Sequence, residues 1–102
     1  MVKVLTDNEF NDFVNGSFYS AVGFYHPNAE KKDEMLAVLN NFVETHGNVD
    51  IGSLDISENK SAANFGITEA VGPIVVVFKQ GKPFKAFKDT FSVEALSEAM
   101  VS

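Results

Sequence analysis

A short apolar run that breaks at a proline and passes into a long amphipathic pattern is the feature that most constrains this sequence. Tyr19 to Tyr25 is mostly apolar without alternation, which predicts a strand covered on both faces of a sheet. Pro27 ends this run, and apolar residues then recur at helical spacing from Ala29 to His46. In α/β domains, reactive groups gather where strand carboxyl ends meet helix amino ends. Here that position is filled by Ala29 to Lys32, which contain no thiol or hydroxyl nucleophile.

The composition fits one domain with one core and excludes several kinds of partner. The 102 residues are predicted to form a single domain, 1–102, and 45% of them are hydrophobic, including ten phenylalanines. The formal net charge of −6 argues against binding to nucleic acid or to an anionic membrane, because both need a basic surface. All eight of the lysine and arginine residues are lysines. Arginine is therefore not present to bind phosphate or carboxylate through two hydrogen bonds.

Cysteine is absent from the sequence, which excludes disulfides, thiolate metal sites and every reaction that needs a thiol. No apolar stretch is long enough to span a membrane, and the amino terminus lacks a signal pattern. If the sequence is the whole gene product, we expect a cytoplasmic protein with no membrane contact. We also expect a monomer or weak dimer that uses no cofactor and has no enzymatic activity.

Strand and helix patterns alternate along the chain without a linker or a repeat. Thr6 and Glu9 have the spacing of a capping box, Gly16 and Gly66 follow helical patterns, and Gln80-Gly81 predicts a tight turn. The predicted strands are Val2–Leu5, Tyr19–Tyr25, Val49–Ile56, Ile74–Phe78 and Pro83–Lys88, and the predicted helices follow Thr6, begin at Ala29, span Glu58–Phe65 and follow Ser92. This order implies a parallel core with an antiparallel hairpin at one edge.

Five motifs spread over nearly the whole chain carry a resemblance to a known family. They are Val4-Leu5-Thr6-Asp7-Asn8-Glu9-Phe10, Phe24-Tyr25-His26-Pro27, Leu54-Asp55-Ile56-Ser57-Glu58-Asn59, Asn64-Phe65-Gly66-Ile67, and Pro73 with the hairpin sequence that follows it. Together they resemble the thioredoxin-like family. The resemblance implies an α/β thioredoxin fold, with a central mixed sheet of about five strands and four flanking helices. It also implies a cis bond between Gly72 and Pro73, before the fourth strand.

The redox chemistry of that family depends on a Cys-Gly-Pro-Cys motif, which this chain lacks. Counting without gaps from Pro27 puts the two thiol positions at Ala29 and Lys32, and neither residue can exchange a disulfide. The buried carboxylate of the family falls at Gly23, and the lysine beside it falls at Ser53. The resemblance therefore implies a redox-inactive member that has lost both the reacting groups and their supporting pair, with no catalytic residue.

The best candidate for a binding site is the surface where these motifs are expected to meet. Its members adjoin the expected cis-proline and are mildly apolar; they are Tyr25, Pro27, Ala29, Val71, Gly72, Pro73 and Ile74. In redox-active relatives the backbone beside that proline pairs with an extended peptide. The resemblance therefore implies a non-catalytic module, such as a chaperone, adaptor or subunit, that binds a protein or peptide. The alternative interpretation is an unused remnant of the groove.

A weaker resemblance, to a domain of calsequestrin, rests on three motifs: Tyr25-His26-Pro27, Gly66-Ile67-Thr68-Glu69 and Asp89-Thr90-Phe91-Ser92. That family uses cysteine-poor thioredoxin folds as acidic calcium-binding modules. The alternative function is therefore weak binding of a divalent cation such as calcium. No loop of this sequence has the ligand spacing of a calcium site, so we assign no metal ligands.

Two further groups of residues have both a functional and a structural interpretation. His26, Glu30 and Asp33 could form a weak metal site or an acid–base pair, or they could be a loop histidine followed by acids that suit a helix amino end. A basic stripe on the predicted hairpin could dock an acidic partner, or could protect an edge strand from aggregation. The stripe consists of Lys79, Lys82, Lys85 and Lys88.

Overall fold

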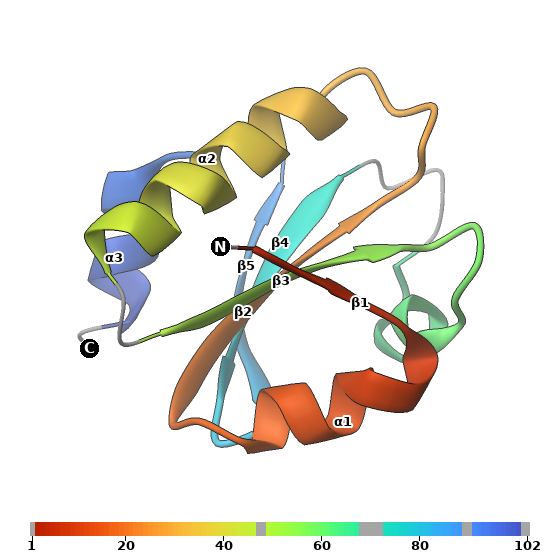
Figure 1. The fold of residues 1–102 in the computed structure, drawn as a ribbon, viewed down its shortest axis with the longest axis horizontal. Helices are drawn as coiled ribbons and strands as arrows, with labels where there is room; N and C mark the ends of the chain where they lie inside the picture. Colours follow the sequence, from red (N-terminus) through yellow and green to blue (C-terminus); the bar gives the residue numbers. More distant parts are fainter. Residues whose placement is uncertain (1, 47–48, 68–72, 89–90, 101–102) are drawn as a thin grey trace.

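A five-stranded mixed sheet lies between two layers of helices (Figure 1). The computed structural model describes residues 2–46, 49–67, 73–88 and 91–100. The strands are β1 (Lys3–Leu5), β2 (Tyr19–Tyr25), β3 (Asp50–Asp55), β4 (Ile74–Lys79) and β5 (Lys82–Lys88). Their order in the sheet is β1-β3-β2-β4-β5; β1, β2 and β3 are parallel, and β4 and β5 are antiparallel additions. The predicted parallel core and edge hairpin are confirmed.

Each face of the sheet is covered by two helical elements (Figure 1). These elements are α1 (Asp7–Asn15), α2 (Lys32–Thr45), the 3-10 helix η1 (Ser61–Phe65) and α3 (Val93–Met100). α1 and η1 lie on one face, while α2 and α3 lie on the other. The described part of the chain therefore has three α-helices and one 3-10 helix, where the sequence predicted four flanking helices.

β2 is the central strand, and its side chains alternate between two cores. Ala21 belongs to the cluster beneath α2 and α3, whereas Val22 and Phe24 belong to the cluster beneath α1 and η1. All three side chains are fully buried. Burial of a side chain such as Val22 or Phe24 contributes about 1.5–3 kcal/mol, so a strand buried on both faces is mostly apolar, with Ser20 as the buried polar exception here. This requirement explains why the run lacks polar alternation.

The first turns of α2 differ from the prediction, because the helix begins at Lys32 rather than at Ala29. Two tight turns come first: the Ala29 amide donates to the His26 carbonyl at 2.9 Å, and the Lys32 amide donates to the Ala29 carbonyl at 3.4 Å. The bond from the Met35 amide to the Lys31 carbonyl, at 3.0 Å, has the spacing of an α-helix. Residues 29–31 therefore belong to the loop that precedes the helix.

The short helix predicted from Glu58 is also later and tighter than expected, and spans only Ser61–Phe65. The Asp55 carboxylate accepts hydrogen bonds from the Ser57 amide at 2.8 Å and the Ser57 hydroxyl at 2.6 Å, which hold the chain in a turn after β3. Gly66 ends the helix with a φ of 75°, a left-handed conformation that suits glycine. The predicted stop at this glycine is confirmed, although the predicted start is wrong.

The predicted capping box of α1 does not form, and a contact with η1 replaces it. Thr6 makes no side-chain bond to the helix backbone; its hydroxyl donates to the Glu9 carboxylate at 3.2 Å. The Asp7 amide instead donates to Asn59 Oδ1 at 2.9 Å. The Asp7 carboxylate accepts from the amides of Lys60 and Ser61 and from the Ser61 hydroxyl, at 2.6–2.9 Å. The starts of α1 and η1 are therefore tied to each other.

This contact makes stability depend on pH. The Ser61 hydroxyl, followed by the amides of Lys60 and Ser61, holds the pKa of Asp7 below its ordinary value of 3.8. Because the folded-state pKa is lowered, the stabilisation is present above about pH 4 and is lost as pH falls through the folded-state pKa. Asp7→Asn should lower the melting temperature at pH 7, and the difference from the unmodified protein should shrink toward pH 3 in thermal melts followed by circular dichroism.

The matched control is Asp12→Asn, at an exposed position of the same helix. It should change the melting temperature little at either pH. A difference between Asp7→Asn and the unmodified protein that stays constant from pH 7 to pH 3 would contradict the proposed role of the carboxylate charge.

The tip of the β4–β5 hairpin is a two-residue turn with an unfavourable residue at its first position. Gln80 and Gly81 have φ angles of 52° and 81°, as expected for the turn type that matches the twist of a hairpin. The Gln80 amide donates to the Phe18 carbonyl at 2.7 Å, which attaches the tip to the loop after α1. A Cβ on Gly81 would lie 1.9 Å from Asn15 Oδ1. Glycine is therefore required at 81, whereas glutamine at 80 is tolerated at a cost.

Gln80→Asn should raise the free energy of unfolding by about 0.5–1 kcal/mol, because asparagine adopts a positive φ more readily. Gly81→Ala should lower it by at least about 1 kcal/mol, because of both its φ and its contact with Asn15. Urea unfolding curves measure both values. A stabilising Gly81→Ala, or a destabilising Gln80→Asn, would show that the turn has another conformation.

Candidate functional site

The candidate surface lies at the edge of the sheet where β2 and β3 end and β4 begins. Tyr25 pairs with Asp55 of β3, and Phe24 pairs with Ile74 of β4. Continuing the antiparallel register by one residue places Pro73 beside Tyr25. Pro73 is buried, whereas Tyr25 and Ile74 are partly exposed. The structure therefore brings together three members of the predicted surface from two strands far apart in the sequence.

The loop between β2 and α2 supplies the next members. Pro27 is exposed, and Ala29 and Lys32 are partly exposed; Lys32 is the first residue of α2. Val71 and Gly72 lie outside the described residues, so their part of the predicted surface, and the predicted cis bond to Pro73, remain predictions. What the structure does describe is a strand-end surface with an amide at Asn28, a methyl group at Ala29 and an amine at Lys32.

Gly23 and Ser53, where the resemblance places a buried ionisable pair, are direct neighbours on β2 and β3. A Cβ on Gly23 would lie 2.7 Å from both Leu39 Cδ1 and Met35 Cε, far closer than atoms normally approach. The side chains of α2 therefore fill the space above the Gly23 backbone. Ser53 is 3% exposed and carries no charge. The positions of Gly23 and Ser53 therefore hold no ionisable group.

Gly23→Ala tests this packing. The added methyl group should destabilise the protein by about 1–3 kcal/mol, because it must displace Met35 or Leu39. Met35→Ala alone should cost about 2–5 kcal/mol. In that background Gly23→Ala should cost markedly less, since the vacated space accepts the methyl group. Equal costs of Gly23→Ala in the two backgrounds, measured by urea unfolding, would contradict the close packing of α2 on Gly23.

An open hollow of about 320 Å³ lies beside the strand ends, on the η1 side. Its lining combines small apolar side chains with a few polar groups: His26, Ile56, Ser57, Asn59, Ala62, Ala63 and Ile67. His26 Nδ1 accepts a hydrogen bond from the Asn28 amide at 3.1 Å, which fixes the orientation of the ring. The sequence patterns did not predict this hollow. Adjacent alanines on a short helix are the one signal that could have indicated it.

Tyr25 brings a hydroxyl to the same edge of the sheet. Burial raises the pKa of Tyr25 above its usual value of 10.0, and the nearby carboxylates of Asp55 and Glu58 raise it further. The phenol is therefore neutral at physiological pH and can donate a hydrogen bond. A phenol that stays neutral suits recognition of a peptide carbonyl better than proton transfer.

The other candidate groups do not form a centre for chemistry. Within the described residues, no three histidine, aspartate or glutamate side chains lie close enough to hold a metal ion, so His26, Glu30 and Asp33 form no such group. The calcium alternative therefore depends on the weaker resemblance alone. His46 stacks on Phe42 with ring centroids 4.3 Å apart, which favours a packing role at the end of α2. No helix among the described residues has the length and apolar character to cross a membrane.

The strand order, the helices on each face and the hairpin at the edge define a thioredoxin-like fold, here without any cysteine. Thioredoxin of Plasmodium falciparum has a TM-score of 0.84 and 16% sequence identity, with 98% of each chain covered. A designed protein has a TM-score of 0.78 and 23% identity, covering 98% of this chain and 94% of that one. No protein-family model and no curated protein matches the sequence.

These similarities establish the fold only, and the function has to be argued from the site. In all, 333 chains of solved structures match this chain. The fold is therefore a common one, and such folds host many functions. The predicted fold class, with its five-stranded mixed sheet, is confirmed. Because the chain contains no cysteine, it has no thiol with which to perform thiol–disulfide exchange.

Proposed function

We propose that this protein is a non-catalytic thioredoxin-fold module that binds a protein or peptide at the strand-end surface. That surface is the one predicted above: Tyr25, Pro27, Ala29, Val71, Gly72, Pro73 and Ile74. The observation that carries the proposal is the packing of Met35 and Leu39 onto Gly23. It leaves no space for an ionisable group below the site, while the frame that surrounds the site is kept.

The chemistry of the surface supports a peptide rather than a small charged substrate. Tyr25 offers a neutral hydroxyl, and Ile74, Pro27 and Ala29 offer modest apolar contact. The adjoining hollow of about 320 Å³ is large enough for one or two side chains of a bound segment. Backbone pairing along an extended peptide would supply affinity that side chains this small cannot.

The proposal has several further parts. The Gly72–Pro73 bond is cis, which the carbon chemical shifts of the proline ring would report. The protein is a cytoplasmic monomer or weak dimer whose partner is a protein or peptide, and it has no enzymatic activity and no affinity for nucleic acid or membrane. Its net charge of −6 supports the last of these parts.

Selection from a displayed peptide library, followed by nuclear magnetic resonance titration, tests the proposed site. A selected peptide should shift the amides of Tyr25 to Ala29 and of Ile74. Ala29→Glu should weaken binding about tenfold, because it places a charge in the contact. Ala37→Glu is the matched control: it makes the same change at an exposed position of α2 and should leave affinity unchanged.

Shifts confined to another face, or equal affinity for the Ala29→Glu and Ala37→Glu variants, would reject the strand-end surface as the binding site. Melting temperatures of both variants, measured under the same conditions, separate a lost contact from a lost fold.

A further inference from the structure

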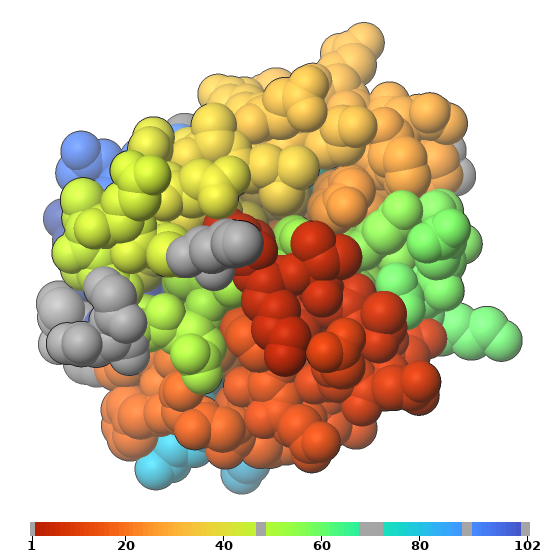
Figure 2. Space-filling model, viewed as in Figure 1, coloured from red at the N-terminus to blue at the C-terminus, as the bar shows by residue number. Residues whose placement is uncertain are grey.

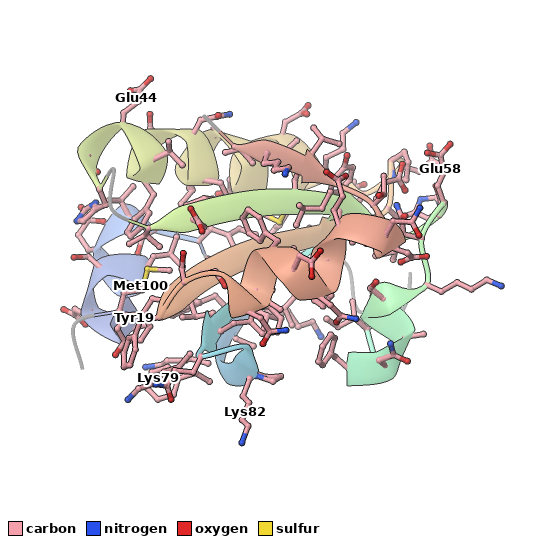
Figure 3. The ribbon with its side chains drawn as sticks, turned by 60° about the horizontal axis from the view of Figure 1, so that its bottom comes forward. Tyr19, Glu44, Glu58, Lys79, Lys82 and Met100 are labelled. Carbon is pink, nitrogen blue, oxygen red and sulfur yellow. The ribbon has the colours of Figure 1, made fainter. Side chains whose placement is uncertain are left out.

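Three aromatic rings surround one ammonium group at the end of the sheet opposite the strand-end surface. Lys79 Nζ lies 5.5 Å from the ring centroid of Phe18, 5.9 Å from that of Tyr19 and 5.4 Å from that of Phe84. These distances are within the range of cation–π attraction. Tyr19 and Lys79 lie together in the structure, with Lys82 nearby (Figure 3). We call Phe18, Tyr19, Lys79 and Phe84 the aromatic–lysine patch.

Two large aromatic side chains of the patch are exposed to solvent. Phe18 is 52% exposed and Phe84 is 44% exposed, and the Phe18 and Tyr19 rings meet edge to face with centroids 4.8 Å apart. The tip of the β4–β5 hairpin protrudes beyond α1, where it is open to a partner (Figure 2). Clustered exposed aromatic rings of this kind are typical of contact sites.

The hairpin that carries the patch concentrates positive charge in an acidic protein. Four of the eight lysines lie between residues 79 and 88, a segment without an acidic residue, although the net charge is −6. In the part of the chain that the structure describes, none of these four lysines is paired with a carboxylate. The hairpin is therefore a local excess of positive charge in an acidic chain.

Protection of an edge strand explains the lysines but not the aromatic rings. β5 is the edge of the sheet, and six of its seven residues are exposed. Lysines on such a strand discourage pairing with another sheet. An exposed phenylalanine on the same strand has the opposite effect, so Phe84 calls for a second explanation. Together, the rings and the positive charge match a ligand that is both acidic and apolar.

We propose that the aromatic–lysine patch, with Lys82 and Lys85, docks an acidic segment of a partner protein that carries aromatic or aliphatic side chains. Carboxylates of the segment would meet the ammonium groups, while its apolar side chains would pack against Phe18 and Phe84. Charge complementarity favours this occupant over nucleic acid, which the remaining acidic surface would repel. A few side chains around one hairpin tip also suit a short segment better than a second copy of this chain.

This surface is independent of the strand-end surface. Tyr19 is the first residue of β2 and Tyr25 is the last, so the two surfaces are separated by the length of a strand, about 20 Å. Binding at one surface can therefore be tested without disturbing the other.

Fluorescence anisotropy with a labelled peptide of alternating glutamate and phenylalanine tests the proposal. Binding should weaken as salt rises, because the charges are exposed. Lys82→Glu should weaken binding about fivefold, and Phe84→Ser should have a similar or larger effect. Lys60→Glu makes the same charge change beyond the carboxyl end of β3, at the opposite end of the sheet, and should leave affinity unchanged. Amide shifts should map to residues 18–19 and 79–85.

Three results would overturn the proposal: no binding of the peptide, equal loss of affinity in the Lys82→Glu and Lys60→Glu variants, or shifts confined to residues 25–32. Preferential binding of an oligothymidine strand in place of the peptide would assign the patch to nucleic acid and also reject the proposal. Concentration-dependent dimerisation that Phe84→Ser abolishes, without peptide binding, would assign the patch to a second copy of this chain. Thermal melts of each variant establish that a loss of affinity is not a loss of fold.

Discussion

The packing of α2 against the bare backbone of Gly23 is the contact on which the rest of the structure depends. Met35 and Leu39 approach the central strand so closely that even one added methyl group would have to displace them. This approach places α2 over β2 and closes the core on that face. It also excludes an acidic side chain from the position where a proton relay would have to lie. The contact thus closes the core on this face and leaves no room for an acidic side chain there, while the absence of cysteine removes the thiol chemistry itself.

Most of the fold could be predicted from the sequence, because its signals are local. The apolar run of β2, the turn at Gln80-Gly81, the stop at Gly66 and the cap at Ser92, whose hydroxyl accepts from the Ala95 amide at 3.1 Å, all depend on neighbouring residues. The start of α1 after Thr6 was predicted correctly, but the bond between Asp7 and Ser61 that replaces the capping box was not, because these residues are 54 positions apart. The predicted start of α2 at Ala29 was wrong, because two tight turns held by backbone hydrogen bonds come before the helix.

The candidate site was also predictable in part from the sequence. The resemblance identified the strand-end positions, and the register of β2 with β4 brings Tyr25, Pro73 and Ile74 to one edge. The hollow beside η1 was not predicted, and of the aromatic–lysine patch only the lysines of the hairpin were, because both features gather residues from separate segments. The patch in particular depends on the pairing of Tyr19 with Lys79, which no local pattern reveals. The two ends of one sheet thus differ in character: a mildly apolar edge of mixed charge at one end and a basic aromatic corner at the other.

The central claim is that the loop before α2 and the segment before β4 form one continuous surface, where relatives of this fold carry their reactive groups. Nuclear Overhauser contacts between the Ala29 methyl group and the ring protons of Pro73 test it most directly. The account predicts cross-peaks between these two groups in the free protein. Their absence from a fully assigned spectrum, with the Ala29 methyl group in contact with another part of the chain instead, would contradict it.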